Sequence, residues 1–330
     1  MQLQSVERAP GAFQQGVAAD DIEAMCRRAF GNNVQVVRAV EIGVGTYNST
    51  YRVDIEGRAA VILRVAPRRA SSDDVSQDGM RNEHAAAPNF ASLDPLIPRT
   101  LAVDFTHQIV ERDYLIQTAL VGVSAADGLA AYPRESWHSY YRQLGSITRA
   151  IHAVRGPSFG PVAGPQHDRW SAELRVQFGE LAAEVAAADL DQDGVQRVLA
   201  CVDVHRGLLD EVTEPRLLHG DLWSLNILID PNAAEPTITG VLDCDRASWG
   251  DPLADWTIHK IRQRPSSEAD PFWESYDRPA DTDAAVLRKQ FYQARHLIGS
   301  RLDIHRRGMD ISDIPPVHWD LADVLARLGG

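Results

Sequence analysis

The fold is decided by the stretch LLHGDLWSLNILID at residues 217–230. In it, an apolar pair leads to the carboxylate of Asp221, and the amide of Asn226 follows five positions later, before the strand-like run ILI. A turn then begins at PN, and the run TITGVL at residues 237–242 is typical of a returning strand that ends at Asp243. If the two runs pair as a hairpin, Asn226 and Asp243 lie side by side at its open end.

These side chains carry the oxygen groups that phosphoryl transfer needs. The reaction requires a carboxylate that orients and deprotonates the attacking hydroxyl, and ligands for metal ions that neutralise charge on the β- and γ-phosphates. Asp221 fits the first role. Asn226 and Asp243 fit the second, because hard cations such as Mg²⁺ prefer oxygen ligands. The pattern predicts a magnesium-dependent kinase.

A longer match supports this interpretation. The order of HGD at residues 219–221, Asn226 and the run DCDRASWGDPLAD at residues 243–255 resembles the aminoglycoside phosphotransferase and choline-kinase-like family of small-molecule kinases. The resemblance implies a protein-kinase-like fold, Asp221 as catalytic base, Asn226 and Asp243 as metal ligands, Mg²⁺ as cofactor and ATP or GTP as phosphoryl donor. It leaves Asp245 open, since the family varies there, and we assign it to acceptor binding.

The resemblance extends to the N-terminal half. The run IGVGTYNSTYRV at residues 42–53 lies between two strand candidates, where the family places its phosphate-covering loop. Small residues there would let backbone N–H groups approach the phosphates, although a glycine-rich hairpin is more often just a turn. The nucleotide-binding residues expected in this run are Gly43, Gly45, Asn48, Ser49 and Thr50.

Four more nucleotide-binding residues are expected further along. Arg64 stands where protein kinases carry the lysine that contacts the phosphates, and Glu83 stands where they carry its helical partner. Arginine departs from that pattern, yet its fork can pair with both carboxylate and phosphate. Gln117 and Ala119 match the hinge between lobes, where backbone groups would bind the nucleotide base.

The acceptor residues are less defined. Trp273, Glu274, Tyr276 and Asp277 form an aromatic and acidic cluster in the late region where the family builds its acceptor pocket, although core packing explains the aromatic residues equally well. We expect His219 to fix its loop and His152 to be a core histidine. Asp251 and Asp255 are expected to serve structure, by capping or by anchoring the catalytic loop, rather than chemistry.

The pattern of elements predicts an α+β protein with strands first and helices later. Strand-like runs at 34–42, 50–55 and 60–65 suggest an antiparallel meander, followed by a helix over 80–93 and strands over 100–104 and 114–117. From residue 135 helical stripes dominate, with helices expected over 135–154, 170–188, 195–212 and 285–307. We therefore expect a sheet-bearing nucleotide-binding lobe over 1–118 and a mainly helical catalytic and substrate-binding lobe over 119–330.

Composition narrows the class of protein. The chain has 330 residues, 44% of them hydrophobic, and a formal net charge of −13, which argues against nucleic acid or an anionic membrane as partner. Three cysteines make a disulfide framework implausible, and no apolar run has the length of a membrane span. We expect a cytoplasmic monomer or homodimer that acts on a small-molecule hydroxyl acceptor.

The acceptor itself stays open at this stage. We expect an antibiotic of the aminoglycoside, cyclic-peptide or nucleoside type, so that the enzyme confers resistance. A metabolic kinase acting on choline, ethanolamine, homoserine or a sugar is the alternative. A remote third reading makes Asp243 the nucleophile of a phosphatase, since VLDCD at residues 241–245 resembles the opening motif of haloacid-dehalogenase-like enzymes. There Thr or Val would follow, whereas this chain has Arg246.

Overall fold

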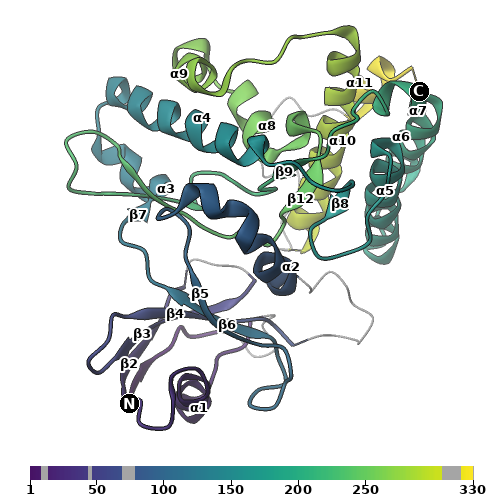
Figure 1. Cartoon of the computed structure of the whole chain (residues 1–330). Helices are drawn as coiled ribbons and strands as arrows, with labels where there is room; N and C mark the ends of the chain where they lie inside the picture. Colours follow the sequence, from purple (N-terminus) through teal and green to yellow (C-terminus); the bar gives the residue numbers. More distant parts are fainter. Residues whose placement is uncertain (9–13, 44–46, 69–78, 307–320, 330) are drawn as a thin grey trace. The chain divides into compact units, whose positions relative to one another are not determined.

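The chain forms two compact units in the computed structural model, which describes residues 1–8, 14–43, 47–68, 79–306 and 321–329 (Figure 1). The first unit comprises Met1–Arg134 and Ser224–Arg246, and the second comprises Glu135–Trp223 and Ala247–Gly330. The expected division into functional lobes at residue 118 stays a prediction. None of the helices in the described part of the chain has the length and apolar character that a membrane crossing needs.

A six-stranded sheet, in the order β1-β2-β3-β4-β6-β5, is the framework of the first unit. Its strands pair antiparallel except for β1, which adds to the edge of β2 in parallel. The meander β2-β3-β4 has the predicted connectivity, and alternate residues of β3 point into the core because side chains alternate across a strand. The strand bounds are β1 Gln2–Gln4, β2 Val36–Glu41, β3 Ser49–Ile55, β4 Val61–Val65, β5 Thr100–Asp104 and β6 Tyr114–Thr118.

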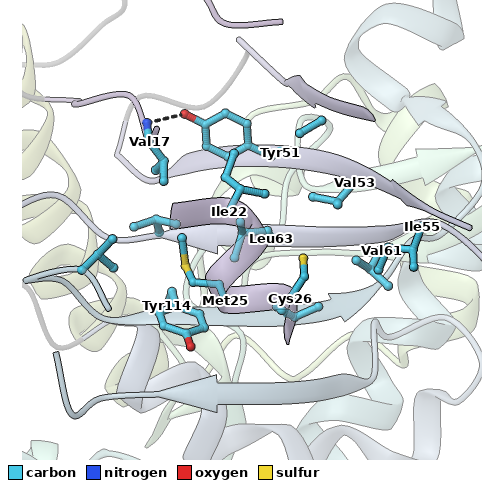
Figure 2. Close-up of a cluster of buried hydrophobic side chains, with 14 residues drawn as sticks. Val17, Ile22, Met25, Cys26, Tyr51, Val53, Ile55, Val61, Leu63 and Tyr114 are labelled. Atoms are coloured by element: carbon cyan, nitrogen blue, oxygen red, sulfur yellow. Dashed lines mark hydrogen bonds between the residues drawn. The ribbon is translucent and has the colours of Figure 1, made fainter. Parts of the chain in front are cut away.

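Helix α1, Ala19–Phe30, packs on this sheet through one apolar face. Ile22, Met25 and Cys26 follow at helical spacing, and Figure 2 shows them among the sheet residues Tyr51 and Leu63. The hydroxyl of Tyr51 accepts a hydrogen bond from the Val17 N–H at 2.9 Å, so that the tyrosine is buried without losing its polar partner. Each large apolar side chain buried here contributes about 1.5–3 kcal/mol.

The rest of the first unit holds shorter elements. The helix expected over 80–93 is an α-helix only over α2, Gly79–Ala86, and continues as the 3₁₀ helix η2, Ala87–Leu93, because Pro88 supplies no backbone N–H. A small sheet β7-β10-β11 contains the predicted hairpin, with Ile227 opposite Val241. The remaining bounds are β7 Val123–Ser124, α3 Ala125–Gly128, η3 Leu129–Ala131, η4 Arg134–Ser136, β10 Ile227–Ile229 and β11 Ile238–Val241.

The second unit is mainly helical, with one three-stranded sheet in the order β8-β12-β9. Helix α4 buries its predicted apolar stripe and packs closely on α9, where a Cβ at Gly145 would lie 2.4 Å from the backbone oxygen of Phe272. The helix expected over 195–212 is interrupted at His205. The bounds are α4 Trp137–Ala153, β8 Gly160–Pro161, α5 Trp170–Ala187, α6 Asp193–Val204, α7 Arg206–Leu209, β9 Arg216–Leu218, β12 Ser248–Gly250, η5 Pro252–Ala254, α8 Trp256–Arg262, α9 Ser266–Tyr276, α10 Asp283–Arg306 and α11 Leu321–Arg327.

Candidate active site

The β10–β11 hairpin brings two of the predicted metal ligands next to each other in the first unit. The N–H of Leu242 donates to the backbone oxygen of Asn226 at 2.8 Å, one position before Asp243. Asp243 ends the hairpin with a φ of +64°, a left-handed conformation that aspartate tolerates better than most residues. The backbone therefore places an amide and a carboxylate at the open end of the hairpin.

Arg64 on β4 joins this end of the hairpin to α2. One of its terminal nitrogens contacts both carboxylate oxygens of Glu83, at 2.6 and 2.5 Å, and the other contacts Asp243 Oδ1 at 2.5 Å. Burial opposes the charge on the guanidinium, but the carboxylates of Glu83 and Asp243 outweigh it and raise the pKa of Arg64. Gln117 on β6 donates from Nε2 to Glu83 Oε1 at 2.9 Å and completes the coordination of this carboxylate.

Asp245 is the second carboxylate close to the hairpin end. Its burial, reinforced by the negative charge of Asp243, raises its pKa to about 7. Its backbone oxygen accepts from Nδ2 of Asn82 at 2.8 Å, whereas its buried Oδ1 has no hydrogen-bond partner in the part of the chain that the structure describes. A buried acceptor without a donor favours a cation or an added donor at this point.

This donor set fits a magnesium ion that a nucleotide helps to hold. Among the described residues, no three His, Cys, Asp or Glu side chains form a metal-binding group by themselves. Mg²⁺ is commonly bound by one or two carboxylates together with substrate phosphates and waters, and so does not need such a group. Asn226, Asp243 and Asp245 are the residues that could contribute oxygens to it.

The predicted phosphate-covering loop is described in part. Gly45 lies outside the described residues. Gly43 follows β2, and Thr50 lies in β3, where its backbone oxygen accepts from the N–H of Ile42 at 2.7 Å. Ser49 is buried, and its hydroxyl donates to the backbone oxygen of Gln15 at 2.8 Å. The Ser49 hydroxyl is therefore buried and already hydrogen-bonded within the protein.

Asn48 and Ala119 complete the residues predicted to bind the nucleotide. Asn48 accepts at its backbone oxygen from Nε2 of Gln14 at 2.9 Å, and its buried Oδ1 has no partner among the described residues. Ala119 follows β6 by one residue. Their roles in nucleotide binding stay predictions.

In the second unit, the loop that carries Asp221 is fixed by a single buried carboxylate. Asp255 Oδ2 accepts from the N–H of His219 and Asp255 Oδ1 accepts from the N–H of Gly220, both at 3.0 Å. The Asp221 N–H in turn donates to His219 Nδ1 at 3.4 Å, and Gly220 has a φ of +82° that favours glycine. The two residues that precede the predicted base are thus held by their backbone, as expected for His219 and Asp255.

Asp255 is itself supported from α4 and α9. His152 Nε2 lies 2.9 Å from Asp255 Oδ2, and His152 Nδ1 lies 2.7 Å from the hydroxyl of Tyr276. Burial disfavours the carboxylate, yet the hydrogen bond and charge of His152, together with the backbone N–H of His219, hold the pKa of Asp255 below its usual range. His152 is buried, as predicted, but it also links two helices to the catalytic loop.

The nearby Asp251 has a structural role, as predicted. Its carboxylate accepts from the hydroxyl of Tyr292 at 2.6 Å, from Nε of Arg288 at 2.9 Å and from the N–H of Leu253 at 3.0 Å. It therefore ties α10 to the segment that leads into α8.

Of the predicted acceptor residues, Trp273, Glu274 and Asp277 do not share one environment. Trp273 lines a pocket formed by α8, α9 and α10. Glu274 is exposed and pairs with Arg142 at 3.3 Å, and Asp277 lines a second, more open pocket beyond the end of α9. Sequence reasoning grouped them because they are neighbours in the chain, but the helix turns them in different directions.

A match over most of the sequence identifies the family of the chain. A model of the family described as "Phosphotransferase enzyme family" matches residues 38–288, well over half of the chain. The chain belongs to this family. It is therefore a phosphotransferase that uses a hydroxyl acceptor, as predicted, and the matched range contains every predicted site residue. No curated protein sequence matches the chain.

Solved structures agree with a protein-kinase-like phosphotransferase fold. The apo form of a thermostable mutant of aminoglycoside phosphotransferase APH(4)-Ia superimposes with a TM-score of 0.59 at 21% identity, covering 93% of this chain and 97% of that one. A putative aminoglycoside phosphotransferase from Ralstonia eutropha JMP134 gives 0.61 at 15% identity, covering 94% and 97%. The GDP complex of wild-type aminoglycoside 2'-phosphotransferase-IIIa gives 0.60 at 16% identity, covering 93% and 96%. At these identities the likeness establishes the fold alone.

Sequence reasoning missed several contacts of this phosphotransferase. The contact of Asn82 with Asp245 and the link from Tyr276 through His152 to Asp255 join segments that lie far apart in the sequence. A single sequence carries no signal for such pairs. The alternation of Arg262 and Arg264 after an apolar helix face was a visible signal, because both arginines line the same pocket as Trp273.

Proposed function

We propose that this phosphotransferase moves the γ-phosphate of ATP or GTP to a hydroxyl of a small-molecule antibiotic of the aminoglycoside, cyclic-peptide or nucleoside type. The observation that carries the mechanism is the clamp of Asp255 on the two N–H groups preceding Asp221. A base held on a loop fixed by its backbone loses little orientational freedom in the transition state. A thermostable mutant of APH(4)-Ia, similar in fold, forms a ternary complex with AMP-PNP and hygromycin B, which supports a nucleotide donor and an antibiotic acceptor.

In this proposal, Asp221 orients the acceptor hydroxyl and accepts its proton as the oxygen attacks the γ-phosphorus. The new P–O bond forms while the bond to the β-phosphate oxygen breaks, and a nucleoside diphosphate leaves. Bound Mg²⁺ would neutralise negative charge on the phosphates, and Asn226 and Asp243 are the residues proposed to hold it. Arg64 provides a fixed positive charge beside Asp243, held in place by Glu83.

The test is transfer of labelled γ-phosphate from ATP and from GTP to a panel of compounds, by wild-type protein and by Asp221→Asn. We expect transfer to fall at least about a hundredfold in the variant, because a positioned general base contributes about 10²–10⁴-fold. Nucleotide affinity should stay within a few-fold of wild type. Asp168→Asn, at an exposed aspartate of the second unit, is the matched control and should transfer at the wild-type rate.

The panel also decides the acceptor class. It contains the three antibiotic types together with choline, ethanolamine, homoserine and simple sugars, and a strain that expresses the protein is challenged with each antibiotic. Transfer to a metabolite, without transfer to or resistance against any antibiotic, would refute the antibiotic assignment and favour the metabolic kinase. Wild-type transfer by Asp221→Asn would refute the catalytic assignment.

A further inference from the structure

A pocket in the second unit combines an apolar floor with a cationic rim. It has a volume of about 260 Å³ and is enclosed by residues of η5, α8, α9 and α10 and of the segment between α9 and α10. Leu253, Ile258, Ile261 and Ala269 provide its apolar surface. The charged residues that line it are the cations Arg262, Arg264, Arg278 and Lys289 and the single carboxylate Asp281.

Lys289 is the most buried of these cations. Lysine is rarely buried unless it is paired, and here the ammonium group contacts Asp281 Oδ1. An ammonium group has three N–H donors, and this is its only partner among the described residues. Lys289 therefore brings a positive charge into the pocket together with N–H donors that are available to a ligand.

The three arginines of the pocket also have N–H donors without a hydrogen-bond partner among the described residues. Arg262 has no ion pair or side-chain hydrogen bond within the described ranges of the chain. Arg264 lies 3.6 Å from Glu268, and Arg278 lies 3.8 Å from Asp270, distances too long for hydrogen bonds. Their N–H groups thus keep most of their capacity to bind an oxyanion, because a guanidinium carries five donors.

Trp273 gives the rim a fixed geometry. The guanidinium of Arg278 lies over its indole ring, 5.2 Å from the ring centroid, so that a cation–π contact orients the arginine. The same indole lines the pocket and offers a flat apolar face beside the charged groups. This arrangement suits a ligand that has both an apolar part and a negatively charged group.

The charge of the pocket is opposite to that of the protein. The chain carries a net charge of −13, whereas the pocket lining has four cations and one carboxylate. Lys289, Arg264 and Arg278 each face one carboxylate, whereas Arg262 faces none at ion-pair distance among the described residues, so N–H donors of the lining remain for an anionic group. We propose that this pocket binds the phosphate, sulfate or carboxylate group of a small molecule whose apolar part rests on Ile258, Ile261 and Trp273.

The pocket is also connected to the loop that carries Asp221. Thr257, on the first turn of α8, donates from its hydroxyl to the backbone oxygen of Leu222 at 2.9 Å, and Asp255 holds the N–H groups of His219 and Gly220. The next residue, Ile258, lines the pocket. A ligand in the pocket thus contacts the helix that supports the catalytic loop.

The binding test uses naphthalene-1-sulfonate, with neutral 1-naphthalenemethanol as the uncharged counterpart, in calorimetric titrations. The sulfonate should bind the wild-type protein. The double variant R262Q/R278Q should raise its dissociation constant at least about tenfold, because charge-assisted hydrogen bonds to the sulfonate are lost. Arg301→Gln is the matched control, since Arg301 is exposed on α10 and lies outside the pocket lining. It should leave the constant unchanged.

Three results would overturn the proposal: sulfonate binding that is absent in the wild type, equal in R262Q/R278Q, or weakened as much by Arg301→Gln. Equal affinity for 1-naphthalenemethanol would also overturn it, because the cations would then contribute nothing. Circular dichroism confirms that each variant is folded before titration. The same titration with Asp221→Asn shows whether binding persists when transfer is lost, so that failure of the pocket and failure of the proposed function are distinguishable.

A kinetic comparison identifies the source of the anionic group. The hypothesis that the anionic group belongs to the phosphate acceptor rests on the proposed function. In that case R262Q/R278Q should raise KM for glucosamine 6-phosphate but not for glucosamine. If the wild type phosphorylates neither, another pair of acceptors that differ only in an anionic group should show the same difference in KM. If both KM values stay unchanged while sulfonate binding is weakened, the ligand is a separate effector. Either result supports the site, and inorganic phosphate as competitor should displace the sulfonate in both cases.

Discussion

Replacing Asp255 by asparagine tests the support of the catalytic loop most directly. The carboxylate accepts three hydrogen bonds, from the His219 N–H at 3.0 Å, the Gly220 N–H at 3.0 Å and His152 Nε2 at 2.9 Å. Asparagine keeps the shape but has one acceptor oxygen, and its NH₂ group faces a donor. With the amide oxygen in the place of Oδ2, the hydrogen bonds from His219 and His152 persist as neutral ones, and the hydrogen bond from the Gly220 N–H is lost because it faces the NH₂ group.

The magnitude follows from these contacts. A hydrogen bond to a charged group contributes about 1.5–3 kcal/mol and a neutral one about 1 kcal/mol, so one lost and two weakened hydrogen bonds amount to about 3–6 kcal/mol. The substitution also removes the cost of desolvating a buried carboxylate, which offsets part of this loss of stability. We expect Asp255→Asn to lower the free energy of unfolding by about 3 kcal/mol, and to accelerate amide exchange at His219 and Gly220 by about a hundredfold, since 1.4 kcal/mol corresponds to a factor of ten.

The assays are urea unfolding and residue-resolved hydrogen exchange. Asp168→Asn makes the same chemical change at an exposed site and should alter neither quantity. A loss below about 1 kcal/mol, together with unchanged exchange at His219 and Gly220, would refute the view that Asp255 fixes the loop.

Three further predictions concern stability. Arg64→Met should lower the free energy of unfolding by about 3–5 kcal/mol in urea titrations, because it leaves Glu83 as a buried unpaired carboxylate; Arg64→Lys, which keeps one charge, should lose less. Burial and neighbouring cations lower the pKa of His259 from 6.5 to about 4. As the pH falls, the unfolded chain therefore binds a proton at His259 before the folded chain does, and the free energy of unfolding should fall by about 3 kcal/mol between pH 6.5 and 4. His259→Phe should flatten this part of the plot of unfolding free energy against pH. Gly220→Ala should reduce stability by about 1–2 kcal/mol in thermal melts, because its φ of +82° disfavours a Cβ; an unchanged melt would contradict this.

The hairpin and the meander could be predicted because their causes are local. Alternating apolar residues, a turn and a chain reversal specify β10 and β11, and these alone bring Asn226 beside Asp243. The pairing of Arg64 with Glu83 was also predicted, through the family resemblance, and the structure contains it. Roles that depend on bound nucleotide or metal stay predictions.

Other features have causes that the sequence does not display locally. The parallel edge strand β1 has only three residues and forms because β2 has a free edge. The burial that raises the pKa of Asp245 arises from α2, which is far away in the sequence. The partition of Trp273 and Asp277 into different pockets depends on where α9 ends, and helix ends are poorly specified by sequence patterns.

The segment from Asp251 to Arg264 explains why the acceptor class cannot be read from the catalytic motif alone. Its first part holds the loop through Asp255, and its last part supplies Arg262 and Arg264 to the cationic pocket. Asp255 must accept hydrogen bonds from the backbone N–H groups of His219 and Gly220. This requirement is the same whichever small molecule receives the phosphate. Arg262 and Arg264 do not supply the hydrogen bonds that hold the loop at His219 and Gly220, so their charge is free to match a ligand. A polycationic acceptor would be repelled by this pocket at close range, and an acceptor with an anionic group would be attracted to it. If the KM comparison identifies the ligand of the pocket as the acceptor, the charge of the pocket favours antibiotics that carry an acidic group over a polyamine.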